Sequence, residues 1–181
     1  MHTRLVRRAT DGGLLDLTYR VVDSPIGPLL LATTPAGLVR VAFESEGRDA
    51  VLESLADRVG PRILHDPHGF PGLVEQLREY FAGRRHGFDV AVDLRLAHGF
   101  GLEVLAQLRE IPYGTTRSYA AVAASAGRPR AVRAVGTACA HNPVPLVVPC
   151  HRVVRSDGTP GGYLGGPQAK EFLLRLESAA A

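Results

Sequence analysis

The sequence has no tryptophan, one methionine and two cysteines among its 181 residues. Two cysteines cannot form a disulfide framework, and Cys139 and Cys150 do not have the spacing of zinc ligands, so we expect no metal. We find neither a secretion signal nor an apolar run of membrane-spanning length, which predicts a cytoplasmic protein without membrane contact. Lysine is almost missing as well, because Lys170 is the only one and arginine carries nearly all the positive charge.

What is present is typical of a soluble globular protein with a substantial core: 45% hydrophobic and 22% charged residues, with a net charge of +3. The small positive excess is a weak indication of a polyanionic partner. The pattern changes near residue 95. We expect a basic extension at residues 1–14, an α+β domain at residues 15–95 and a mainly helical domain at residues 96–181.

The first half alternates apolar and polar residues and then changes to helical spacing. Turn-forming residues separate three expected strands, and the whole resembles a meander followed by two helices and a last strand. The expected strands are Leu15–Val22, Leu29–Thr33, Leu38–Phe43 and Phe88–Asp93, and the expected helices are Arg48–Val59 and Phe70–Ala82.

Three histidines of this half, His65, His68 and His86, are scattered among prolines and glycines. They lack the i, i+4 spacing of a helical metal pair. We therefore interpret them as surface residues rather than ligands.

The second half contains short helices joined by tight turns. The first is predicted at Gly101–Glu110, and Thr116-Arg117-Ser118 offers an N-cap for a second that runs to Gly127. A third follows from Arg130 to about Ala140. Two short helices joined by a glycine-containing turn indicate a helix-turn-helix.

Arginines gather at the start of the third helix, where Arg130 and Arg133 are three residues apart and Arg128 comes just before. The remaining positions are mostly small, so this helix could approach a nucleic-acid groove closely. A solvated cationic face is the plainer interpretation of the charge alone. The glycine-rich stretch at residues 155–166, which contains Tyr163, is either a wall over a bound ring or an ordinary surface loop.

The segment Val147–Val154 brackets Cys150, His151 and Arg152 with valines and a proline, which favours an extended or tightly turned backbone. A lone thiol there would most often be a small buried apolar group. A neighbouring imidazole can instead raise the fraction of reactive thiolate. Because successive side chains of a strand point to opposite faces, this requires a turn or a bridging water.

A third group that would orient the imidazole is found in the last helix, expected from Pro167 to about Ser178. Glu177 lies four residues after Leu173 on nearly the same apolar stripe. A carboxylate at this inward edge needs a partner, and His151 is the obvious one, although a frayed end would leave Glu177 in solvent. The three residues could form a relay in which Glu177 orients His151 and His151 accepts the proton of Cys150.

Several motifs in order carry a resemblance to the O6-methylguanine-DNA methyltransferase family. They are Ile111-Pro112-Tyr113-Gly114, Ser118-Tyr119, Arg133-Ala134-Val135-Gly136, Asn142-Pro143-Val144-Pro145 and Val148-Pro149-Cys150-His151-Arg152-Val153. The resemblance continues through Tyr163 to the helix around Lys170-Glu171, and is looser at Asp23–Gly27. It implies a ribonuclease H-like α+β domain followed by a mainly α, winged-helix-like DNA-binding domain.

The resemblance implies an irreversible, single-turnover transfer of an alkyl group from O6 of guanine, or O4 of thymine, to Cys150, without a cofactor. A soft thiolate suits attack on such a carbon. The partner would be double-stranded alkylated DNA, bound by a monomer through the minor groove with the damaged base flipped out.

Individual roles follow from the same resemblance. Asn142 would brace the turn that presents Cys150, Tyr119 would donate to the base, and Arg133 would fill the space left in the duplex. Further DNA contacts are expected from Ser118, Arg128, Arg130 and Arg152, and the substrate pocket from Val153, Tyr163 and Leu164.

Two residues depart from the family pattern. Leu105 stands where tryptophan is usual, which we interpret as a change of packing, and Leu164 stands where serine or another small residue is common.

Two other functions remain open. A lesion sensor would bind alkylated DNA without transfer, and relatives of that kind lack the cysteine. A cysteine hydrolase would need an oxyanion hole, for which we find no motif.

Overall fold

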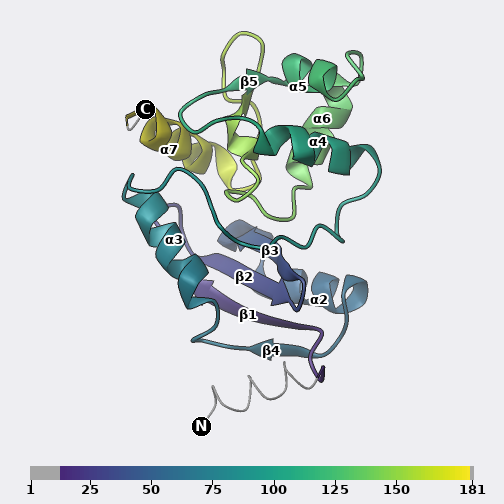
Figure 1. The fold of residues 1–181 in the computed structure, drawn as a ribbon, viewed down its shortest axis with the longest axis vertical. Helices are drawn as coiled ribbons and strands as arrows, with labels where there is room; N and C mark the ends of the chain where they lie inside the picture. The colour runs from purple at the N-terminus through teal and green to yellow at the C-terminus, as the bar shows by residue number, and fades with distance from the viewer. Residues whose placement is uncertain (1–12, 180–181) are drawn as a thin grey trace.

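The computed structural model describes residues 13–179, so the predicted basic extension lies almost wholly outside the described residues. A sheet half and a helical half lie one above the other and are joined by a segment that crosses between them (Figure 1). None of the helices within the described range is long and apolar enough to cross a membrane.

The sheet half contains one four-stranded sheet with the order β3-β2-β1-β4, in which β1 pairs antiparallel with β2 and parallel with β4. Its three long strands confirm the predicted meander. Gly37 begins β3 with a φ of 141°, and a side chain there would collide with the Ala91 carbonyl. The strands are β1 (Leu17–Val22), β2 (Leu29–Thr34), β3 (Gly37–Phe43) and β4 (Ile63–His65).

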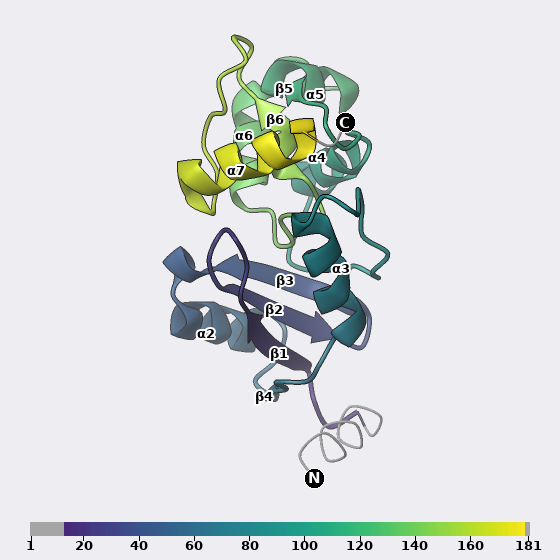
Figure 2. The same ribbon diagram turned by 90° about the vertical axis from the view of Figure 1, so that its left-hand side faces the viewer.

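Alternation along β2 divides the core between two layers. Leu29 and Leu31 face the larger core, which includes α3 and the helical half, whereas Leu30 and Ala32 face the smaller core under α2. Helices α2 and α3 consequently lie on opposite faces of the sheet (Figure 2). Both were predicted, and they span Arg48–Arg58 and Pro71–Phe81, with the short 3-10 helix η1 (Glu44–Glu46) ahead of them.

The sheet differs from prediction at two places. The expected strand Phe88–Asp93 is wrong, because this segment makes only one bridge, from Val92 to Leu38, and otherwise runs as a loop. The fourth strand is instead β4, which has three residues between Pro61 and Pro67. Such a short segment has no measurable alternation, so only its pairing with β1 identifies it.

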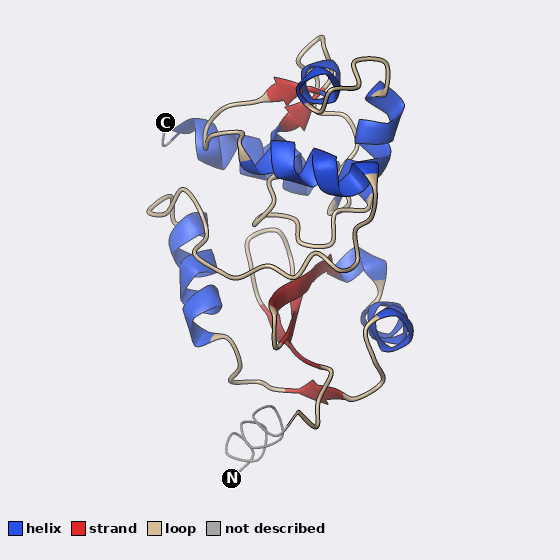
Figure 3. Cartoon of the chain, turned by 45° about the vertical axis from the view of Figure 1, so that its right-hand side comes forward, coloured by secondary structure: helices blue, strands red, loops and turns tan. Residues whose placement is uncertain are grey.

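The helical half confirms the predicted helices, with one shifted start. Ser118 caps α5 as predicted, since its Oγ accepts a hydrogen bond from the Ala121 amide. Helix α6 begins only at Val132, later than the predicted Arg130. The helices are α4 (Phe100–Arg109), α5 (Tyr119–Ser125), α6 (Val132–Ala140) and α7 (Gly166–Ala179). The short strands β5 (Arg117–Ser118) and β6 (Val153–Val154) pair in parallel between them (Figure 3).

Candidate functional site

Cys150 begins a 3-10 turn, η2 (Cys150–Arg152), directly after Pro149. The Arg152 amide donates to the Pro149 carbonyl at 3.0 Å, so the chain turns here rather than continuing as a strand. The turn removes the geometric objection that neighbouring strand side chains point apart. Cys150 is only 2% exposed and lies beneath the helical half's surface.

Asn142 holds the chain that leads into this turn. Its Nδ2 donates to the Val148 carbonyl at 2.8 Å, and its Oδ1 accepts from the Val144 amide at 3.1 Å. Leu146 between them has a φ of 74°, a conformation that costs energy for any residue except glycine. The side chain of Asn142 therefore fixes a strained loop just ahead of the thiol.

His151 is fully buried and bonded to Glu177, with 2.8 Å between Nε2 and Oε1. An ionised carboxylate only accepts, so the proton of the neutral imidazole lies on Nε2. Nδ1 then carries a lone pair, and this nitrogen is buried without a hydrogen-bond partner among the described residues. The imidazole is thus arranged to accept a proton at Nδ1.

Glu177 is the centre of the network and is 1% exposed. Besides His151 it accepts hydrogen bonds from Arg152 through both oxygens, at 2.8 and 2.9 Å, and from the Tyr80 hydroxyl at 2.6 Å. The Gly114 amide donates to it at 3.3 Å. The sequence pattern placed Glu177 at the inward edge of its helix, and the frayed alternative is wrong.

Arg152 is not where the sequence interpretation put it. It was expected to contact DNA, but it is 6% exposed, and its guanidinium binds Glu177 and the Ile111 carbonyl. The reason is the buried carboxylate, which would be costly without a cation beside it. Arg152 belongs to the interior of the site.

Two residues of the site were missed. Tyr80 reaches Glu177 from α3 in the sheet half, and nothing in its apolar stripe distinguishes it from a core residue. Lys170 is fully buried, and its Nζ donates to the carbonyls of Val153 and Gly162 at 2.7 and 3.2 Å. As the only lysine, three residues before Leu173 on the inward stripe, it could have been found from the sequence.

The ionisation of the three central groups follows from burial and charge. Burial raises the pKa of Cys150 to about 11, against the lowering effect of a hydrogen bond with Asn142 and the charge of Lys170. Burial also lowers the pKa of His151, although Glu177 opposes this. For Glu177 burial alone would raise the pKa, but hydrogen bonds from His151 and Arg152 lower it to about 2. The resting site therefore holds a thiol, a neutral imidazole and a carboxylate.

Aromatic residues and the glycine-rich loop surround the turn. Gly161 adopts a φ of 71° and approaches Tyr119 so closely that a Cβ would lie 3.0 Å from its hydroxyl. The ring of Tyr163 packs edge-on against Phe43 and lies 6.3 Å from the ring of His151. Val153 is fully buried just after the turn. The part of the loop from Gly161 to Tyr163 therefore lies against the site, whereas residues 155–159 are exposed.

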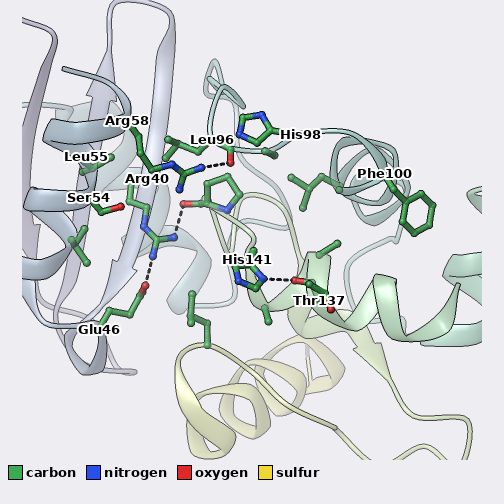
Figure 4. A pocket seen from close by; sticks show the side chains of 18 of the residues that line it. Arg40, Glu46, Ser54, Leu55, Arg58, Leu96, His98, Phe100, Thr137 and His141 are labelled. Atoms are coloured by element: carbon green, nitrogen blue, oxygen red, sulfur yellow. Dashed lines mark hydrogen bonds and ion pairs between the residues drawn. The ribbon is translucent and has the colours of Figure 1, made fainter.

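Leu164 lies at a different cavity from the site that its neighbour Tyr163 contacts. It lines a cavity of about 860 Å³ between the two halves, whose lining does not include Cys150 or His151. Figure 4 shows this cavity, where Arg40 binds the Pro143 carbonyl and pairs with Glu46. The expectation that Leu164 shapes the substrate pocket therefore finds no support in its position.

The expected DNA-contacting residues differ in accessibility. Arg133 is exposed on α6, and Arg130 is exposed in the turn that precedes the helix, so the two do not share a helix face as predicted. Arg128 is also exposed, but it stacks over Phe100 and pairs with Glu103. Ser118 is occupied as the cap of α5. Arg130 and Arg133 are thus exposed, whereas Ser118 and Arg128 already have partners within the protein.

Within residues 13–179 no group of three or more histidine, cysteine or acidic residues is arranged to hold a metal. Of the three scattered histidines, His65, His68 and His86 are all exposed, as predicted, and His86 stacks on Tyr113.

Comparisons with known proteins agree over nearly the whole chain. Residues 17–94 match the family model described as 6-O-methylguanine DNA methyltransferase, ribonuclease-like domain, and residues 99–179 match the DNA binding domain of the same name. Methylated-DNA--protein-cysteine methyltransferases of Mycobacterium bovis and Methanosarcina barkeri are 44% and 43% identical, covering 90% and 88% of this chain and 93% and 96% of theirs.

Solved structures give the same result. The Mycobacterium tuberculosis O6-methylguanine methyltransferase is 42% identical with a TM-score of 0.80, over 91% of this chain and 94% of that one. A structure of Mycobacterium tuberculosis OGT in complex with DNA is 43% identical with the same TM-score and coverage. The similarity therefore includes both the sheet half and the helical half.

Proposed function

The chain belongs to the 6-O-methylguanine DNA methyltransferase family, and from this premise we propose that Cys150 is the residue that accepts the alkyl group. The protein repairs DNA by single-turnover transfer of the alkyl group from O6-alkylguanine to one of its own cysteines. Its predicted fold class, a ribonuclease-like α+β domain and a helical DNA-binding domain, is confirmed.

One observation carries the assignment of the acceptor. Cys150 is the only described cysteine beside an imidazole whose Nε2 is held at 2.8 Å by a buried carboxylate and whose Nδ1 has no partner among the described residues. Cys139, the other thiol, is buried on α6, and burial raises its pKa above the ordinary range. A thiol with a prepared base next to it is the better nucleophile.

The reaction proceeds in one displacement. The proton of the Cys150 thiol passes to Nδ1 of His151, directly or through one water, and Glu177 stabilises the imidazolium that forms. The sulfur lone pair then attacks the alkyl carbon, a carbon–sulfur bond forms, and the carbon–oxygen bond breaks with its electron pair left on guanine. Guanine takes a proton at N1, and the thioether cannot be displaced, so each chain acts once.

The high pKa of Cys150 has a consequence for this mechanism. Because burial raises the pKa of Cys150 to about 11, the resting thiol is protonated at neutral pH and is a weak nucleophile. The thiolate forms only as the proton moves to His151, when the alkylated guanine lies against the sulfur. Tyr119 is expected to donate a hydrogen bond to the leaving guanine, and the proton that His151 takes from the thiol and returns to solvent balances the proton that guanine gains at N1.

DNA is the partner, and we infer that binding is to double-stranded alkylated DNA in the minor groove, by a monomer. Arg133 is exposed on α6, the second helix of the α5–α6 pair, which suits insertion into the duplex after base flipping. Arg130 and Arg128 lie nearby on the exposed turn and suit contacts with phosphates.

We further propose that the two domains meet near residue 95 and that the protein also acts on O4-alkylthymine. The free thiols suit a reducing cytoplasm.

Intact mass measurement tests the acceptor. The protein is incubated with a duplex that contains one O6-methylguanine, beside Cys150→Ser and Cys139→Ser variants. We expect the wild type and Cys139→Ser to gain the mass of one CH2 per chain, and Cys150→Ser to gain nothing. No gain by any variant, despite selective binding of the damaged duplex, would support a lesion sensor. Repeated turnover would support a hydrolase.

A further inference from the structure

Tyr80 belongs to the sheet half, yet its hydroxyl lies inside the network of the helical half. It extends from α3, is fully buried, and donates to Oε1 of Glu177 at 2.6 Å. The hydroxyl oxygen of Tyr80 also lies 3.4 Å from Nε2 of His151. The phenol therefore contacts both the carboxylate and the imidazole of the relay.

We propose that Tyr80 is a positioning residue for alkyl transfer, whose hydroxyl holds Oε1 of Glu177 opposite Nε2 of His151 so that Nδ1 remains the proton acceptor. The proposal rests on the proposed function, because it assigns Tyr80 a role in the same relay. Tyr80 does not touch the thiol, so it acts through Glu177 and His151.

Arg152 alone does not define this arrangement. It donates to both carboxylate oxygens, from Nε to Oε2 and from a terminal nitrogen to Oε1. A guanidinium fork is satisfied by any carboxylate that lies in its plane, wherever the histidine is. The Tyr80 hydroxyl adds a donor at Oε1 only, and from the side on which His151 lies. It therefore selects the one placement of Glu177 that also holds the imidazole.

The tautomer of His151 is what this placement controls. If Oε1 moved away from Nε2, the proton of the neutral imidazole would no longer be held there, and the tautomer with a proton on Nδ1 would gain population. That tautomer cannot accept the thiol proton at Nδ1. In other relays built from a carboxylate and a histidine, the wrong tautomer is what costs activity.

The hydroxyl of Tyr80 is separable from its ring. The ring packs at 5.2 Å from Phe88 and 6.1 Å from Tyr113, in contacts that a phenylalanine would keep. Burial and the negative charge of Glu177 raise the pKa of Tyr80 far above its usual value, so the phenol stays a donor throughout the working range. A Tyr80→Phe substitution therefore removes one hydrogen bond and little packing.

Tyr113 offers a matched control. Its ring stands edge-on to that of Tyr80, and its hydroxyl is buried with no hydrogen-bond partner among the described residues. Tyr113→Phe thus removes the same chemical group from the same cluster without breaking a bond to Glu177.

Two measurements on full-length wild type, Tyr80→Phe and Tyr113→Phe test the proposal. The first is the single-turnover rate of methyl transfer from a duplex with one O6-methylguanine. The second is nitrogen-15 NMR of the imidazoles in DNA-free protein, with the His151 signals assigned from a His151→Gln sample. Shifts of Nδ1 and Nε2 report directly which nitrogen carries the proton.

We expect Tyr80→Phe to transfer the methyl group about tenfold more slowly, with the two His151 nitrogen shifts closer together, and Tyr113→Phe to match wild type in both. If Tyr80→Phe slows methyl transfer but leaves the His151 tautomer unchanged, the proposal is overturned and Tyr80 is a structural residue. Equal effects of Tyr80→Phe and Tyr113→Phe would overturn it as well. A wild type that transfers no methyl while Tyr80→Phe still alters the tautomer would instead refute the proposed function and keep the positioning role.

Discussion

Asp93 in the sheet half and Glu177 in the helical half are both buried carboxylates, but their surroundings differ. Asp93 accepts from the Thr34 hydroxyl at 2.6 Å and from Arg95 at 2.7 Å, and the Arg95 side chain is 45% exposed. Its bonds join the end of β2 to the loop that contains Asp93 and Arg95, and Arg95 is exposed to solvent.

Glu177 accepts five hydrogen bonds from four residues in three parts of the chain, and the cation beside it, Arg152, is itself buried. One of them holds Nε2 of His151, which leaves Nδ1 on the other side of the ring without a partner among the described residues. The comparison shows how a structural carboxylate differs from a functional one. The first is satisfied by its neighbours, whereas the second directs a neighbour toward a group that must react.

The largest effect is expected when the charge of Glu177 is removed. Glu177→Gln leaves Arg152 buried without a countercharge, which we expect to cost about 3–5 kcal/mol of unfolding free energy. We expect methyl transfer to slow at least about a hundredfold, because the imidazolium loses its stabilising charge. Chemical denaturation and single-turnover kinetics measure the two effects.

The matched change in the sheet half is Asp93→Asn. It should lower the unfolding free energy by only about 1 kcal/mol, since the Thr34 hydroxyl and the half-exposed Arg95 lose their charged partner. Methyl transfer should stay at the wild-type rate. Equal kinetic effects of the two variants would contradict the distinction between the carboxylates.

The ionisation of Glu177 should make the stability of the protein depend on pH. The pKa of Glu177 in the folded protein, about 2, lies below its usual value, so its contribution is present above about pH 4.5 and is lost as the pH falls toward 2. One pKa unit is worth about 1.4 kcal/mol, which gives a contribution of up to about 3 kcal/mol.

Unfolding free energies measured from pH 6 to pH 2 check this. The wild type should lose stability steeply below pH 4.5, and Glu177→Gln should show a shallower slope in the same range. The pKa of Asp93 is also lowered, because its hydrogen bonds with Arg95 and Thr34 outweigh its burial, so Asp93→Asn should flatten the slope as well. An identical slope for Glu177→Gln and wild type would mean that Glu177 is not ionised in the folded protein.

A smaller effect is expected from the buried cation near the thiol. Lys170→Met leaves the carbonyls of Val153 and Gly162 without their donor, which should cost about 2 kcal/mol. It also removes a charge that lowers the pKa of Cys150, so transfer should slow several-fold. Arg155→Met, a change of an exposed cation, should stay within about 0.5 kcal/mol of wild type by thermal or chemical unfolding.

The smallest effect on stability should come from the exposed surface of α6. Arg133→Ala removes no described hydrogen bond of its side chain and should change the unfolding free energy by less than about 0.5 kcal/mol. Binding to duplex DNA should weaken, and its salt dependence should decrease slightly, because one positive charge close to the DNA is lost. Fluorescence anisotropy at several salt concentrations measures both, and Arg175→Ala on the exposed face of α7 is the control. Unchanged binding by Arg133→Ala would remove α6 from the interface.

The predictions succeeded where a local pattern had a local cause. Alternation gave β1, β2 and β3, capping gave the start of α5, and helical spacing placed Glu177 on the buried side of α7. They failed at β4, whose three residues become a strand only through pairing with β1, and at Phe88–Asp93, whose alternation is not matched by a partner strand.

Three features could be read from the amino-acid sequence: the order of motifs, the thiol beside an imidazole, and a carboxylate on the inward stripe of the last helix. Three others depend on the folded chain: Arg152 turns inward, Tyr80 reaches across from the sheet half, and Lys170 binds two carbonyls. The physical reason is that a buried charge is stable only when its partners are supplied. For Glu177 those partners are Arg152, 25 residues away along the chain, and Tyr80, 97 residues away. No sequence periodicity connects residues that far apart.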